Sequence, residues 1–336
     1  MKVVAFTHSK PVTDPESLLD FEIAVPVPRH HDLLVEIKAV SVNPVDTKIR
    51  VGGEPLGEPR VLGFDAAGIV RAIGPEVQNF AVGDEVFYAG VPTRPGTNAE
   101  FHLVDHRIVG HKPRKLNFAQ AAALPLTSLT AWEMLFDRFR IPRSKESRGT
   151  LLIVGGAGGV GSIAIQLAAK LTGLTIIATA SRPETAQWCH ELGAHHVINH
   201  HEDMVTRFAA LGLAAPNYIF CVTNQRTHFK KLTELMAPEG AIGIIESSIG
   251  TVDISKLIRK CGTLHTEYMF ARGTLHTSTM EQQHLILEAI AHLVDDGTLK
   301  TTMTENYGII NATNLKRAHA AIEAGSVRGK IVLEGF

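Results

Sequence analysis

The chain has 336 residues, a formal net charge of -1 at pH 7 and a hydrophobic fraction of 45%. This length exceeds what one hydrophobic core usually fills, so we expect a globular protein with two domains. The nearly balanced charge argues against nucleic acid or an anionic membrane as a partner. The three cysteines are widely separated, so the sequence indicates neither a disulfide framework nor a cysteine-rich zinc site.

The sequence lacks the patterns of secretion and membrane insertion. Its N-terminal apolar run is too short for a signal peptide, and it has no stretch of about 18 apolar residues that could span a membrane. We therefore expect a cytoplasmic protein.

Up to about residue 110 the pattern is typical of strands and turns. Residues 33–42 and 99–104 alternate partly between apolar and polar, as half-buried strands do. Turn formers such as Val82-Gly83-Asp84 separate the apolar segments. This part predicts a β-rich domain resembling a partly open barrel.

From Asn117 onward the pattern changes to helices, at 119–124 and 129–136, and then to an alternation of strands and helices. The expected strands are residues 151–154, 175–179, 196–199, 218–222 and 241–245. Such alternation is the signature of βαβ units, so we expect a doubly wound parallel sheet with helices on both faces.

The C-terminal part does not continue this alternation. Residues 280–296 and 314–323 predict helices, and residues 329–334 predict a strand. We expect these elements to return to the first domain. The predicted domains are therefore residues 1–124 together with 272–336, and residues 125–271.

A glycine cluster follows the apolar run at 151–154. Gly156, Gly158 and Gly161 have the spacing of the dinucleotide fingerprint, and a helical pattern follows them. In that motif the glycines form a tight turn, let the backbone approach a pyrophosphate, and allow close packing of helix and strand. The helix N-terminus favours the anion. Glycine clusters also close ordinary turns, but the flanking pattern favours cofactor contacts at Gly156, Gly158, Gly159, Val160 and Gly161.

Ser181 and Arg182 follow the second strand of this alternation, where NAD sites usually place an acidic residue. A hydroxyl and a guanidinium suit a 2'-phosphate instead, which predicts NADP(H) as the cofactor. A second interpretation is structural: Ser181, followed by Pro183 and Glu184, can form a helix N-cap with a capping box. The two roles are compatible, because N-caps and anion sites use the same N–H groups.

With these features, the chain resembles the medium-chain dehydrogenase/reductase superfamily, and within it the zinc-free quinone oxidoreductase branch. Segments that carry the resemblance, besides the glycine cluster, are 41–46 (SVNPVD), 62–70 (LGFDAAGIV), 82–86 (VGDEV) and 124–132 (LPLTSLTAW). The resemblance implies an α/β fold with a Rossmann domain and a GroES-like catalytic domain. It extends to proteins often labelled zinc-type alcohol dehydrogenase-like.

That label can be tested against the zinc ligands. In the zinc alcohol dehydrogenases a cysteine stands at the place of Asn43, and a Gly-His-Glu sequence stands at the place of Gly63-Phe64-Asp65. Asn43 and Phe64 do not supply the donors that a catalytic zinc needs. We therefore predict no metal, and we assign none to the histidine pairs at 30–31, 195–196 and 200–201.

The resemblance also implies candidate site residues. Asn43, Asp46 and Thr127 are expected at the substrate cleft, and Thr130 on the cofactor side. Each has a structural alternative: Asn43-Pro44 forms a turn, Asp46 pairs with Lys48 or Arg50, and Thr127 caps a helix.

Further cofactor contacts are expected at strand ends, where open α/β sheets bind ligands. These are Thr223, Ser247 and His200, the last at a position where relatives commonly stack a tyrosine near the adenine. Phe270 is expected to cover the nicotinamide, with a core or dimer-interface role as an equal alternative.

Together these features predict NADPH-dependent, zinc-independent hydride transfer to a small-molecule quinone or α,β-unsaturated carbonyl. Such acceptors are already activated and need no metal Lewis acid. Two alternatives stay open: a zinc alcohol dehydrogenase with unusual ligands, and a non-enzymatic NADPH-binding protein. An exposed edge of a parallel sheet predicts a homodimer.

Overall fold

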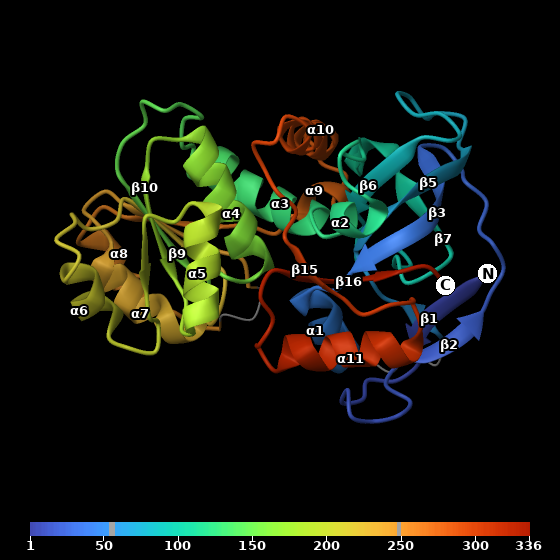
Figure 1. Ribbon diagram of the computed structural model, residues 1–336, viewed down its shortest axis with the longest axis horizontal. Coiled ribbons are helices and arrows are strands. Elements are labelled where there is room, and N and C mark those ends of the chain that lie inside the picture. The colour runs from blue at the N-terminus through green and yellow to red at the C-terminus, as the bar shows by residue number, and fades with distance from the viewer. Residues whose placement is uncertain (54–57, 247–249) are drawn as a thin grey trace. The chain divides into compact units, whose positions relative to one another are not determined.

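The computed structural model describes residues 1–53, 58–246 and 250–336. The chain forms two compact units (Figure 1): Met1–Leu129 with Phe270–Phe336, and Thr130–Met269. The expected boundaries at 124/125 and 271/272 therefore differ from the observed ones at 129/130 and 269/270 by a few residues. None of the described helices is both long enough and apolar enough to cross a membrane.

The first unit is built on a largely antiparallel sheet of seven strands. Its strands are β3 (Asp32–Ser41), β5 (Asp65–Ile73), β6 (Glu85–Ala89), β7 (Phe101–Asp105), β8 (Val109–His111), β15 (Met303–Asn306) and β16 (Lys330–Glu334). β3 is the central strand, since it pairs with β5, β7 and β16. The C-terminal strand thus completes the sheet that the N-terminal part of the chain begins.

A smaller sheet and several helices complete this unit. The small sheet has the order β2-β1-β4. Its strands are β1 (Lys2–Phe6), β2 (Leu19–Glu22) and β4 (Arg60–Val61), and the helices of the unit are α1 (Pro44–Gly52), η1 (His106–Ile108), α2 (Phe118–Ala122), α9 (Phe270–Thr274), α10 (Gln282–Asp295) and α11 (Ala312–Glu323). α3 (Pro125–Trp132) contains the boundary between the two units in the sequence.

The second unit is a parallel sheet with the order β11-β10-β9-β12-β13-β14. Its strands are β9 (Thr150–Val154), β10 (Thr175–Thr179), β11 (His196–Ile198), β12 (Tyr218–Cys221), β13 (Ala241–Ile244) and β14 (Thr263–Thr266). The helices are α4 (Gly159–Leu171), α5 (Pro183–Leu192), α6 (Met204–Ala209), α7 (Gln225–Leu235) and α8 (Ser255–Ile258), with a π-helix, η2, at Glu133–Arg138.

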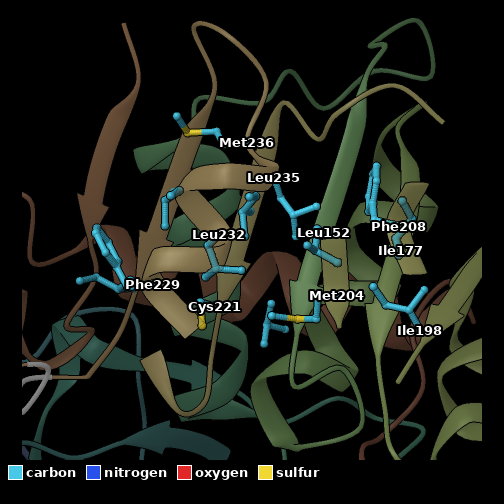
Figure 2. Close-up of a cluster of buried hydrophobic side chains, with 14 of the residues drawn as sticks. Leu152, Ile177, Ile198, Met204, Phe208, Cys221, Phe229, Leu232, Leu235 and Met236 are labelled. Atoms are coloured by element: carbon cyan, nitrogen blue, oxygen red, sulfur yellow. The ribbon is translucent and has the colours of Figure 1, made fainter. Parts of the chain in front are cut away.

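Helices cover both faces of this parallel sheet. On one face, α6 and α7 pack onto the strands through a buried cluster that includes Leu152, Ile177 and Phe229 (Figure 2). Neighbouring residues of a strand point to opposite faces, so Leu151 and Ile153, which are also fully buried, lie on the side of α4. The predicted combination of a Rossmann sheet and a β-rich GroES-like domain is confirmed.

The sixth strand, β14, was not predicted from the sequence. Its residues are Thr-Leu-His-Thr, and each is exposed or only partly buried, because β14 lies at the edge of the sheet. An edge strand pairs on one side only and does not need the apolar run by which buried parallel strands are recognised.

Candidate functional site

The glycine cluster follows β9, the strand at which the strand order of the parallel sheet reverses. From β9 the chain runs outward through β10 to β11, and it then returns to place β12 on the other side of β9. Connections on the two sides of this point leave the sheet in opposite directions. Open α/β sheets bind their ligands at the carboxyl ends of the strands at such a switch point.

Close packing explains two of the glycines in this turn. Gly155 has φ +89°, so the tight turn expected at Gly156 is made one residue earlier, at a left-handed position that favours glycine. A Cβ on Gly161 would lie 2.2 Å from the carbonyl oxygen of Gly155, so only glycine lets α4 approach the strand this closely. By contrast, a Cβ on Gly158 would meet its nearest neighbour at 3.7 Å.

The turn presents the start of α4 to solvent. Gly158 is the N-cap of α4, and Gly158, Gly159 and Val160 are all partly exposed. Backbone N–H groups in the first turn of a helix have no partner within the helix and carry partial positive charge. The residues predicted to contact the pyrophosphate therefore form an accessible site for an anion.

The carboxyl end of β10 differs from the capping expected there. The N-cap of α5 is Arg182, with φ -114° and ψ 148°, and not Ser181. The cause is Pro183, because the residue before a proline is kept out of the helical region. Arg182 Nε lies 2.8 Å from Glu184 Oε1, and both side chains are substantially exposed. Such a surface pair contributes little free energy.

His200 follows β11 and lies in a group of imidazoles. Its ring centroid is 4.6 Å from that of His201 and 6.4 Å from that of His228. Burial, followed by the nearby charges of His201 and His228, lowers the pKa of His200. Its Nδ1 is buried and has no hydrogen-bond partner in the described part of the chain.

The other predicted cofactor residues have different surroundings. Thr223 follows β12, and its methyl group would lie 2.8 Å from a Cβ on Gly155, which places it beside the turn. Thr130 is a buried residue of α3. Phe270 is also buried, and the centroid of its ring lies 5.0 Å from that of Phe64, which is the packing that the core alternative expects. Ser247 lies outside the described residues.

The first unit contains a buried polar network centred on Asp65. Asp65 Oδ2 accepts hydrogen bonds from Ser41 Oγ at 2.8 Å and Asn43 Nδ2 at 2.7 Å, and it lies 3.0 Å from Lys330 Nζ. Its Oδ1 accepts the backbone N–H of Leu126 at 2.7 Å. We call the side chains of Ser41, Asn43, Asp65 and Lys330, with this N–H, the Asp65 network.

Asn43 uses its whole side chain within this network. Its Oδ1 accepts a hydrogen bond from Lys330 Nζ at 2.5 Å while Nδ2 donates to Asp65. Only 1% of Asn43 is exposed. The structure therefore places the amide in a network that bonds both its oxygen and its nitrogen. Asn43 is also the N-cap residue of α1.

Asp46 is a buried carboxyl in the first turn of α1. Its Oδ2 accepts the backbone N–H of Asn43 at 2.6 Å, and its Oδ1 has no hydrogen-bond partner in the described ranges. Burial raises the pKa of Asp46 to about 7, against the opposing effects of the Asn43 N–H and the Lys330 charge. The expected pairing with Arg50 is not formed, because Arg50 binds His319 and Glu323 of α11.

Thr127 does not cap α3 as expected. Its Oγ donates to the carbonyl of Leu124 at 3.1 Å, so the hydroxyl is held inside the first turn. The N–H of Leu126 in that turn is bound by Asp65 from β5. A carboxylate at this position satisfies a free N–H group and complements the positive end of the helix.

The sequence did not identify Ser41, Asp65 or Lys330 as site residues. The available signal was a charged residue at the start of each of two apolar strands, Asp65 in β5 and Lys330 in β16. Buried charges are rare unless they are paired, so two such residues of opposite sign suggest a pair.

The residues of the network do not fit a catalytic zinc. Asn43 offers an amide that is already bonded to an ammonium group, and Phe64 packs on Phe270. Zinc needs three donors from cysteine, histidine or carboxylate with an open fourth position. Within residues 1–53, 58–246 and 250–336, no group of three or more such side chains is arranged to hold a metal ion.

Two protein-family profiles match the chain. The alcohol dehydrogenase GroES-like domain matches residues 29–115, and the zinc-binding dehydrogenase profile matches residues 159–283. Among curated relatives, a zinc-type alcohol dehydrogenase-like protein of Staphylococcus aureus is 42% identical and covers 99% of both chains. The human quinone oxidoreductase is 31% identical and covers 95% of this chain and 94% of its own.

Solved structures show the same similarity. A putative zinc-dependent alcohol dehydrogenase from Rhizobium etli is 52% identical, with a TM-score of 0.95, and covers 100% of this chain and 98% of its own. The Escherichia coli quinone oxidoreductase in complex with NADPH is 26% identical, with a TM-score of 0.85, and covers 99% of this chain and 100% of its own.

The raised pKa of Asp46 predicts a pH-dependent stability difference between the wild type and Asp46→Asn. The carboxyl has an ordinary pKa of 3.8 and a folded-state pKa of about 7, so the folded state binds more protons between these values. The wild type therefore loses folding free energy as the pH rises from about 4 to about 7. Asparagine keeps an oxygen for the Asn43 N–H but cannot ionise, so the variant avoids this loss.

Urea unfolding of both proteins at about pH 4 and about pH 8 measures the difference. We expect the wild type to lose more than about 1 kcal/mol relative to Asp46→Asn between the two conditions. If the free energy of unfolding had the same pH dependence in both proteins, the raised pKa of Asp46 would be contradicted.

Proposed function

Because this chain belongs to the medium-chain dehydrogenase/reductase superfamily, we propose that it is an NADPH-dependent, zinc-independent oxidoreductase that transfers hydride to a quinone or an α,β-unsaturated carbonyl. The observation that carries the proposal is the glycine turn at the switch point between β9 and β12, with the exposed start of α4 beside it. This is the geometry in which Rossmann sheets bind the pyrophosphate of a dinucleotide.

The choice of NADPH depends on the carboxyl end of β10. The proposed 2'-phosphate contacts are Ser181 and Arg182, and Arg182 can exchange its exposed partner Glu184 for the phosphate. The NADPH complex of the Escherichia coli quinone oxidoreductase supports the same cofactor. When bound, the nicotinamide supplies the hydride. The remaining proposed cofactor contacts are Thr130, Gly156, Gly158, Gly159, Val160, Gly161, His200, Thr223, Ser247 and Phe270.

The choice of acceptor depends on the Asp65 network of the first unit. The ammonium group of Lys330 donates to Val42 O, Asn43 Oδ1 and Asp65 Oδ2, which supports an acceptor that is already electrophilic and needs no Lewis acid. A quinone takes one hydride from NADPH and one proton from the medium to give a hydroquinone and NADP+. We propose that Asn43, Asp46 and Thr127 position the substrate side of the site through their fixed bonds.

We expect the purified protein to oxidise NADPH with a simple quinone such as 1,4-benzoquinone in buffer that contains a metal chelator. Absorbance at the NADPH band follows the reaction, with ethanol and NADP+ as the control pair for alcohol oxidation. No turnover across a panel of quinones and enones, despite tight NADPH binding, would favour the non-enzymatic alternative. If the protein contained one zinc ion per chain and lost its activity when that ion was removed, the zinc alcohol dehydrogenase alternative would be favoured.

Replacing Arg182 tests the cofactor choice. Arg182→Ala is expected to weaken NADPH binding about tenfold or more and to leave NADH binding nearly unchanged, because a charged contact to the 2'-phosphate is lost. Glu184→Gln is the matched control, since it removes the competing partner and should strengthen NADPH binding slightly. Fluorescence titration with both cofactors measures the effect. An equal loss for NADPH and NADH in Arg182→Ala would exclude this contact.

We also propose that the chain forms a homodimer through β14, the edge strand whose outer backbone groups have no neighbouring strand within the described sheet. Antiparallel pairing of two β14 strands would satisfy these groups under a two-fold axis. Light scattering after gel filtration is expected to give twice the mass of the chain for the wild type. For Leu264→Pro we expect the mass of a single chain. A monomeric wild type at micromolar concentration would contradict the proposal.

A further inference from the structure

Lys330 is a buried lysine with every donor in use. It is 3% exposed, and its Nζ donates to Val42 O at 3.0 Å, Asn43 Oδ1 at 2.5 Å and Asp65 Oδ2 at 3.0 Å. An ammonium group has three N–H bonds, so these three oxygens satisfy it completely. Lys330 therefore has no donor left for a substrate, and any part it takes in a reaction is indirect.

The ammonium lies among groups that would repel each other without it. Asp65 is fully buried, and the carboxyl of Asp46 is close enough for the charge of Asp65 to oppose its ionisation. The charge of Lys330 favours the ionised form of Asp46 and so lowers its pKa. Buried carboxylates need a cation or a proton, and in the Asp65 network the cation comes from the chain itself.

The same bonds determine how Asn43 is oriented. Its Oδ1 must face the ammonium group, because Lys330 can only donate, and its Nδ2 must face Asp65, because a carboxylate can only accept. The amide thus has one allowed orientation. Without the ammonium group, Oδ1 of Asn43 would lose its donor, and the bond from Nδ2 to Asp65 would be the remaining constraint on the amide from this pair of residues.

The network also connects two helix N-termini. Asn43 begins α1, which carries Asp46, and Asp65 binds the first turn of α3, which carries Thr127. Lys330 comes from β16 near the end of the chain and joins these segments to the β3–β5 part of the sheet. Lys330 therefore bonds Asn43 directly, and it is connected to the helices that carry Asp46 and Thr127 through Asn43 and Asp65.

We propose that Lys330 is the resident cation of this site: its ammonium group holds Asn43, Asp65 and the Val42 carbonyl in one arrangement, and it thereby positions the substrate side for hydride transfer. The inference rests on the proposed function. Unlike a metal ion, the ammonium group has no open coordination position. The proposal therefore favours acceptors that need no Lewis acid.

The test compares Lys330→Met with Lys112→Met. Methionine keeps much of the length of lysine and removes the charge. Lys112 is a matched control, because it too is buried, donates to two carbonyl groups, of Pro113 and Leu116, and pairs with a carboxylate, Glu85 at 3.1 Å. Both variants lose a buried lysine, but only Lys330→Met loses the bonds to Asn43 and Asp65.

We expect Lys330→Met to lower kcat for the quinone roughly tenfold to hundredfold, with the Kd for NADPH within about twofold of the wild type, because misplaced groups cost rate more than cofactor binding. Lys112→Met, measured per folded molecule, should keep the wild-type kcat. A wild-type kcat in folded Lys330→Met, or an equal loss in both variants, would overturn the proposal.

A measurement on the wild type does not depend on the folding of either variant. The protein is incubated with excess zinc chloride, passed through gel filtration, and analysed for bound metal and activity. We expect activity to be independent of zinc, with any retained ion removable by chelator without loss of turnover. One zinc per chain that is required for turnover would overturn the proposal. If the wild type shows no turnover with any acceptor, the proposed function is wrong. If the wild type turns over and Lys330→Met has the same kcat, only this inference is wrong.

Discussion

The buried pair of Asp65 and Lys330 is the interaction on which the rest of the first unit depends. The two residues are 265 positions apart in the sequence and 3.0 Å apart in the structure, with 0% and 3% of their side chains exposed. A buried pair gains little net free energy over apolar packing, but breaking one partner leaves an uncompensated charge. Its importance is therefore geometric: it determines where the N-termini of α1 and α3 lie.

The second unit depends on a different constraint, which is steric. Gly161 permits α4 to lie against Gly155, and Gly155 takes the left-handed conformation that turns the chain from β9 into the helix. This places the partly exposed first turn of α4 at the carboxyl edge of the sheet, where the strand order reverses. In one unit the critical groups are charged and fully enclosed, and in the other they are backbone groups left open to a ligand.

Much of the fold followed from patterns that act over short distances. Five strands of the parallel sheet and the glycine turn were predictable, because buried parallel strands form apolar runs and the turn has a fixed spacing. The edge strand β14 was not, since it is polar and half-exposed. The N-cap at Arg182 was misplaced by one residue, because the restriction that Pro183 imposes outweighed the preference of Ser181 for capping.

The site was less predictable, because its bonds join segments that only the fold brings together. Asn43, Asp46 and Thr127 were identified by resemblance, yet the groups that hold the side chain of Asn43 come from β5 and β16. No local pattern could pair Asp65 with Lys330. The names of some relatives point to zinc, whereas in this chain the position beside Asn43 and Asp65 is occupied by the ammonium group of Lys330.

A double-mutant cycle between Asp65 and Lys330 tests most directly whether this pair acts as one unit. The free energy of unfolding is measured for the wild type, Asp65→Asn, Lys330→Met and the double variant. We expect the double variant to lose less than the two single variants summed, by more than about 1 kcal/mol, because each single change leaves a buried group without its partner. Additive losses would contradict the account, since they would mean that the two charges stabilise the fold independently.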